Sequence, residues 1–85
     1  LAQDEIVKIM QESIKSGQVK SFKLEDVSEW TSGDPEEVNG VKYNIGMVVY
    51  TGTTFMGKSQ LRGKAFITGG KVNNWINPKS GTDLK

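Results

Sequence analysis

Residues 38–51, VNGVKYNIGMVVYT, decide the fold, because apolar and polar side chains alternate along them. The odd positions after the Asn-Gly turn are apolar: Val41, Tyr43, Ile45, Met47 and Val49. Alternation with a period of two is typical of a β-strand that buries one of its two faces. The stretch therefore predicts a strand whose odd-numbered side chains point into the core.

The next predicted strand, residues 55–68, alternates in the same way. A three-residue turn between the two strands pairs Ile45 with Leu61, whereas a shorter turn would place Lys58 in the apolar row. A slip of one residue reverses the face of every side chain, so the apolar pattern favours the longer turn. We therefore expect all odd positions over 41–67 to face inward.

Two glycines, Gly69 and Gly70, mark a hairpin turn into a last strand over 71–77. The turn pairs Ile67 with Val72. This pairing places Trp75 on the face away from the helix.

The N-terminal segment has helical periodicity. Ile6, Met10 and Ile14 recur every four residues, which predicts an amphipathic helix over 3–16. Asp4 and Glu5 stand in the first turn, where the helix dipole favours negative charge, and Gly17 follows the last turn. A helix of this length is marginal alone in water, so its apolar side must pack on the sheet.

Between the helix and the alternating strands, residues 19–25 predict a first strand, and residues 31–37 are polar with Gly and Pro and predict a flexible loop. The polar tail 79–85 follows a proline and is expected to fray. Residues 1–85 thus predict one α+β domain, with an N-terminal helix packed on one face of a four-stranded antiparallel meander sheet.

Composition narrows the chemistry. The chain has neither cysteine nor histidine, which removes thiolate chemistry, the usual neutral-pH general base and the commonest zinc ligands. No catalytic constellation is recognisable, so we expect no enzyme, no metal and no cofactor. Residues 1–40 hold nine acidic side chains against four lysines, whereas residues 41–85 hold seven basic side chains against one aspartate. The two halves can attract each other, or the basic half can bind an anionic partner.

Two local patterns suggest binding chemistry. Residues 52–59, GTTFMGKS, match the letters of a phosphate-binding P-loop, but a P-loop needs a following helix and here the following residues alternate as a strand. The acidic residues over 25–37 lack the spacing of a calcium-binding loop, and a solvated loop explains them.

The face of the sheet away from the helix is the predicted binding surface. It is expected to carry basic and apolar side chains together: Tyr50, Met56, Lys58, Arg62, Lys64, Phe66 and Trp75. An apolar patch ringed by charge favours a protein partner or a homodimer. Basic side chains interleaved with aromatic ones also suit binding of single-stranded nucleic acid or another anionic ligand, which is the alternative hypothesis.

Two stretches resemble the cystatin-like and small NTF2-like domains of bacterial exported proteins. Residues 39–45, NGVKYNI, are similar to the cystatin strand that begins with Gly and an aromatic, and residues 63–75, GKAFITGGKVNNW, resemble the last hairpin of the small exported domains. The resemblance implies a helix followed by a curled antiparallel sheet. It also implies a non-catalytic interaction module outside the cytoplasm, exported or lipid-anchored through an anchor upstream of this chain.

Overall fold

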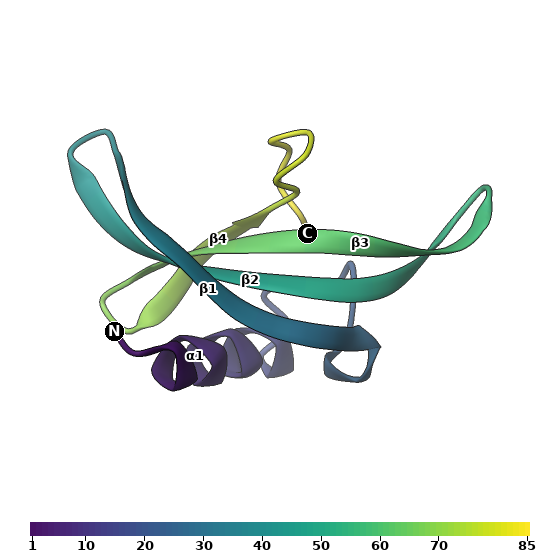
Figure 1. Ribbon diagram of the computed structural model, residues 1–85, viewed down its shortest axis with the longest axis horizontal. Helices are drawn as coiled ribbons and strands as arrows, with labels where there is room; N and C mark the ends of the chain where they lie inside the picture. Colours follow the sequence, from purple (N-terminus) through teal and green to yellow (C-terminus); the bar gives the residue numbers. More distant parts are fainter.

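The computed structural model describes residues 1–85 and has one helix on one face of a four-stranded antiparallel sheet (Figure 1). The strands lie side by side in chain order, as a meander, so the predicted α+β class and arrangement are confirmed. In order, the elements are the helix α1 (Gln3–Lys15), a 3₁₀ turn (Leu24–Asp26) and the strands β1 (Val27–Val38), β2 (Val41–Thr54), β3 (Gly57–Thr68) and β4 (Lys71–Ile76).

Helix α1 lies within its predicted range. Its buried side includes Ile6, Met10 and Ile14, the residues that recur every four positions. The Ala2 amide donates to the Glu5 carboxylate at 3.4 Å, and Gly17 takes a φ of +84° just beyond the last turn. The helix thus begins and ends where its local signals indicate.

The prediction of a strand over 19–25 is wrong. This segment is an irregular connection that ends in the 3₁₀ turn, where the Lys23 amide donates to the Asp26 carboxylate at 2.9 Å. Val19 and Phe22 are buried, and the Phe22 ring stacks on Tyr50 with centroids 4.2 Å apart. The apolar residues here anchor a crossing segment to the core, and this produces the same alternation as a strand.

The prediction of a flexible loop over 31–37 is also wrong, because these residues lie in β1 and pair with β2. Pairing is interrupted by register shifts between Val27 and Glu29 and between Gly33 and Glu36. Pro35 falls in the second interruption, on a strand at the edge of the sheet, where a missing amide donor is tolerated. The turn-forming residues therefore mark a bulge inside a strand.

The β2–β3 register differs from the predicted one. Tyr50 pairs with Leu61, and Thr54 pairs with Gly57 across a two-residue turn of Phe55 and Met56. Relative to the expected pairing of Ile45 with Leu61, the register is shifted by five residues, an odd number, which reverses the faces of β2 relative to β3.

The helix requires this register. Gly46 lies directly under α1, where an added Cβ would come 2.5 Å from the Met10 sulfur. On β3, Ala65 and Ile67 are fully buried, so the odd positions of that strand face inward as expected. On β2 the even positions face inward, and the prediction that Val48 and Tyr50 face outward is wrong.

The β3–β4 turn at Gly69 and Gly70 has positive φ at both residues, and Ile67 pairs with Val72 as expected. A register shift then follows, and it pairs Trp75 with Ala65 on the helix side of the sheet. The expected outward position of Trp75 is therefore wrong.

The tail after β4 is held in place, contrary to the expectation that it frays. The Leu84 amide donates to the Trp75 carbonyl at 2.9 Å, and Asp83 forms a bridge with Ile76. The Ser21 hydroxyl donates to the Lys85 carbonyl at 2.6 Å. These bonds fasten the C-terminal residues along β4, which would otherwise be a bare edge.

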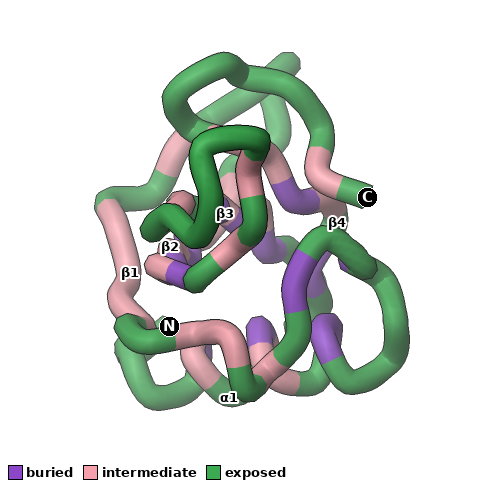
Figure 2. The backbone as a smooth tube through the Cα atoms, turned by 90° about the vertical axis from the view of Figure 1, so that its right-hand side faces the viewer, coloured by how far each residue is buried: buried purple, intermediate pink, exposed green.

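The core is the layer between α1 and the sheet (Figure 2). Eleven buried residues form one cluster there, and Trp75 is the largest fully buried side chain. The ring of Phe22 packs edge-on against Trp75 at 5.5 Å, which ties the crossing segment to β4.

Candidate functional site

The predicted binding residues divide into two groups. Tyr50 and Trp75 are 4% and 2% exposed and lie in the core, so they are not part of the face turned away from the helix. Burial raises the pKa of the Tyr50 phenol, and the Trp75 indole N–H donates to the Ser13 hydroxyl at 2.9 Å. Both residues therefore stabilise the core and are not available for binding at the outer face.

The other five residues remain on or beyond the outer face, by which we mean the face of the sheet turned away from α1. Four of them, Lys58, Arg62, Lys64 and Phe66, share the outer face of β3 at even-numbered positions, with Lys58 and Arg62 exposed. Met56 is 82% exposed and belongs to the β2–β3 turn, apart from the other four.

The reversed register places additional apolar residues on this surface. We use the name apolar strip for the half-buried outer-face residues Tyr43, Met47 and Val49 of β2 with Phe66 of β3. Sequence reasoning recognised the alternation of the three β2 residues but assigned them to the core. The signal that could have corrected it is Gly46, since the close approach of a helix selects a residue without a side chain.

An ion pair crosses the outer face. The Lys64 ammonium on β3 donates to a carboxylate oxygen of Glu36 on β1, so the pair spans the strand between them. Lys64 also lies 5.1 Å from the centre of the Phe66 ring, which itself packs edge-on against Tyr43 at 5.5 Å. Ile45, on the intervening strand, is only 2% exposed although it faces away from the helix.

A groove runs beside this strip. After β4 the chain turns above the outer face, on the opposite side of the sheet from α1 (Figure 1). Asn77, Pro78 and Lys79 of this turn line one wall, and Met47 and Arg62 lie on the sheet side. The space has a volume of about 560 Å³ and is open to solvent. Most of its lining is polar, and Met47 and Leu61 supply apolar contact beside the Arg62 guanidinium group. Such an arrangement accommodates an apolar side chain next to a carboxylate.

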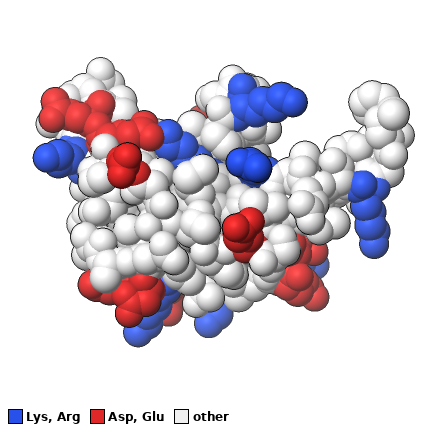
Figure 3. Space-filling model, in the orientation of Figure 1, with Lys and Arg blue, Asp and Glu red and all other residues white.

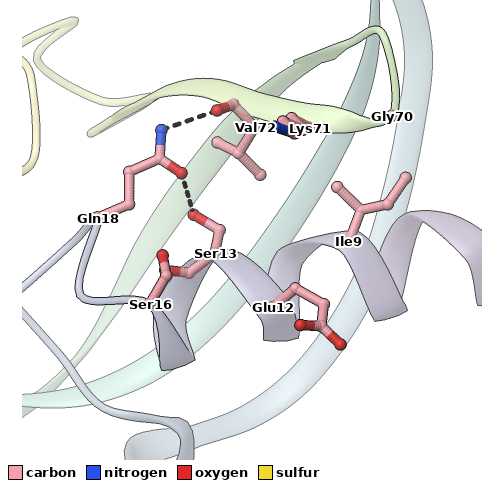
Figure 4. A pocket seen from close by; sticks show the side chains of 8 residues that line it. All are labelled: Ile9, Glu12, Ser13, Ser16, Gln18, Gly70, Lys71 and Val72. Atoms are coloured by element: carbon pink, nitrogen blue, oxygen red, sulfur yellow. Dashed lines mark hydrogen bonds between the residues drawn. The ribbon is translucent and has the colours of Figure 1, made fainter.

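A second hollow, of about 420 Å³, lies between the end of α1 and the β3–β4 turn (Figure 4). The Ser13 hydroxyl donates to the Gln18 side-chain oxygen at 2.6 Å, and the Gln18 amide donates to the Val72 carbonyl at 2.7 Å. These polar groups point toward one another and are already paired. The hydrogen bonds beside this hollow therefore connect the end of the helix to β4.

Charge is separated along the molecule. Acidic side chains gather on the β1–β2 hairpin, whereas the projecting β2–β3 hairpin carries lysine (Figure 3). Only one ion pair, Lys64 with Glu36, joins the acidic and basic halves of the chain. The expected attraction between the halves thus acts through a single direct contact.

Other candidate chemistry has no geometry to support it. The stretch over 52–59 forms the end of the β2–β3 hairpin and is followed by a strand, as expected from its alternation. No three acidic side chains come together in a way that could hold a metal ion. No helix has the length and apolar character needed to cross a bilayer.

The fold defines a small α+β domain in which one helix covers one face of an antiparallel meander. Comparison with family models, with curated proteins and with solved structures finds no match to the chain. The resemblance to cystatin-like and NTF2-like domains is therefore one of topology alone, a helix followed by a four-stranded antiparallel sheet.

Proposed function

We propose that the chain is a non-catalytic binding module that holds a protein partner on the outer face of its sheet. One observation carries the proposal. The apolar strip reaches the surface on a face that the helix does not cover, beside the exposed Arg62 and Lys58. Apolar patches bordered by charged side chains are common features of protein interfaces.

The chemistry of the surface indicates the kind of partner. Met47 and Val49 offer apolar contact, while Arg62 and Lys79 stand beside the groove with positive charge. A partner segment with an apolar side chain next to a carboxylate would complement both. The guanidinium group of Arg62 can bind a carboxylate through two parallel hydrogen bonds, which fixes the orientation of such a segment.

Single-stranded nucleic acid is the second candidate, and the row of basic residues along β3 favours it. Its support is weaker because stacking platforms are needed and two of the expected aromatics, Tyr50 and Trp75, are buried. Lys64 is also engaged with Glu36. Salt dependence separates the candidates, since the logarithm of the single-strand binding constant falls with the logarithm of salt concentration with a slope of about −0.7 per phosphate contacted.

We retain, as part of the proposal, that the module belongs to an exported or surface-anchored protein. This part rests on the topology-level resemblance alone. The partner would then be met outside the cytoplasm.

Site-specific photo-crosslinking tests the proposal. A photoreactive residue at Gln60, on the outer face, should capture the partner, whereas the same residue at Lys8, on the exposed side of α1, should not. With the captured partner purified, Arg62→Glu should weaken binding roughly tenfold. Lys8→Glu is the matched control and should leave it unchanged. Equal capture from both positions would refute the outer face as the binding surface.

A further inference from the structure

The β2–β3 turn exposes two large apolar side chains. Phe55 is 99% exposed and Met56 is 82% exposed, far more than Val38 or Val41 at the opposite hairpin. The turn is the far end of a hairpin that projects from the body of the molecule (Figure 1). Neither side chain contributes to the core, so folding does not explain why they stand there.

The backbone of this turn is partly satisfied from within. The Thr54 hydroxyl donates to the Gly57 carbonyl at 2.9 Å and accepts from the Met56 amide at 3.2 Å. The Met56 amide and the Gly57 carbonyl, which already have a partner, lose less when they leave water. These hydrogen bonds lower the cost of moving the tip from water into a less polar environment.

Charge on the same hairpin points to the chemistry of that environment. Residues 38–82 contain no aspartate or glutamate, and the bases nearest the tip are Lys58 and Arg62. In Figure 3 the projecting hairpin bears lysine and no acidic side chain. The apolar tip, followed along the strand by basic side chains, complements a surface that has negative charge at its boundary with water and an apolar interior.

We propose that the tip formed by Phe55 and Met56 inserts into the head-group region of an anionic lipid surface, with Lys58 against the lipid phosphates. A convex tip of two side chains finds few contacts on a rigid protein surface without a matching pocket. A lipid interface adapts to its shape, and aromatic side chains are favoured at that depth. A basic residue near the surface strengthens such binding, which remains weak and salt-sensitive with Lys58 alone beside the tip. This inference concerns the tip of the hairpin, whereas the proposed partner occupies the groove beside Arg62.

Co-sedimentation of the whole chain with vesicles tests the proposal. At low ionic strength the chain should bind vesicles of equal parts phosphatidylglycerol and phosphatidylcholine, and bind phosphatidylcholine alone far less. Replacing Phe55 and Met56 together by Ser should lower the partition coefficient roughly tenfold. Replacing Lys58 by Gln should lower it about fivefold.

The opposite hairpin supplies the matched control. Val38→Ser with Val41→Ser removes two exposed apolar side chains from a tip flanked by acidic residues and should leave vesicle binding unchanged. A Phe55→Trp variant separates insertion from adsorption, because the added indole emission should shift to the blue on anionic vesicles. No binding to anionic vesicles at low salt, or binding without a blue shift and unaffected by the tip Ser variant, would overturn the proposal. The tip would then remain a candidate for insertion into a pocket of a protein.

Discussion

Glu36 on β1 and Lys64 on β3 form an ion pair that crosses the outer face above the intervening strand β2. The pair joins the acidic half of the chain to the basic half and lies beside the aromatic ring of Phe66. It therefore forms one border of the proposed binding surface.

Removing this ion pair should cost little stability. Glu36→Gln is expected to lower the free energy of unfolding by about 1 kcal/mol or less, because the carboxylate is substantially exposed and solvent screens the pair. Urea unfolding of Glu36→Gln, Lys64→Gln and the double variant measures the coupling, which should fall at about 0.5 kcal/mol. Asp34→Asn, on the same strand and without an ion pair, is the control. A coupling of zero would contradict the expectation that the pair contributes to stability.

Adding one methyl group at Gly46 should destabilise the fold. A Cβ there would lie 2.5 Å from the Met10 sulfur and 2.9 Å from its terminal methyl group, so the helix or the side chain must move. We expect Gly46→Ala to cost about 1–3 kcal/mol by thermal or urea unfolding. Combined with Met10→Ala, the two costs should be less than additive, since the new methyl group fills space that Met10 leaves.

Gly33→Ala is the control for that experiment. Its Cβ would come no nearer than 3.3 Å to a neighbouring atom, the Ile45 Cγ2 on the outer face. It should cost less than Gly46→Ala. The reverse order would contradict the side on which the helix packs.

Ser13 should matter more than its neighbour Ser16. Ser13→Ala leaves the buried Trp75 indole N–H without its acceptor, and an unsatisfied buried donor costs about 1–3 kcal/mol. Ser16→Ala removes only a hydroxyl that donates to the Ser13 carbonyl near the surface. Unfolding monitored by tryptophan fluorescence compares the two. Equal losses would show that the indole does not depend on Ser13.

The sequence predicts the elements whose signals are local. The helix follows from the spacing of Ile6, Met10 and Ile14, and the last turn follows from Gly69 and Gly70 with positive φ. The fold class follows as well, because the last three strands with their two short turns indicate a meander, although the first strand lies over Val27–Val38 and not over 19–25.

The faces of β2 are not predictable in the same way, because the strand is apolar on both sides. Met47 and Val49 face outward while Val48 and Tyr50 face inward, so alternation alone fits either choice. A turn over residues 52–54 predicts the wrong face, because the observed turn is at Phe55 and Met56. Phe55 and Met56 are apolar and give no turn signal in the sequence. The turn is stabilised by the Thr54 hydroxyl, which donates to the Gly57 carbonyl and accepts from the Met56 amide.

The site was half predictable for the same reason. Lys58, Arg62, Lys64 and Phe66 were assigned correctly to the outer face because β3 alternates between small and large or basic residues. The predicted position of Trp75 is wrong because the register shifts between Phe66 and Ile67, and no feature of the sequence indicates this shift. A large side chain with a partner for its indole N–H is more stable in the core, and packing decides this over local pattern.

Alkaline pH should reveal the burial of Tyr50. Its pKa is raised above the ordinary value of 10.0 by burial and returns to that value on unfolding. The stability contributed by the neutral phenol is complete below pH 10.0 and is lost as the pH rises through the folded-state pKa. Tyr50→Phe should therefore lose less stability than the wild type across this range, measured by urea unfolding. Tyr43→Phe, which keeps Tyr50, should retain the wild-type decline.

The orientation of β2 decides whether the proposed binding surface exists, and two adjacent substitutions test it most directly. Val49→Asp places a carboxylate on the outer face opposite Arg62 and should leave the chain folded by circular dichroism and thermal unfolding. Val48→Asp buries an unpaired charge under the helix and should unfold it. If Val49→Asp unfolds the chain and Val48→Asp does not, the apolar strip lies in the core and the account is contradicted.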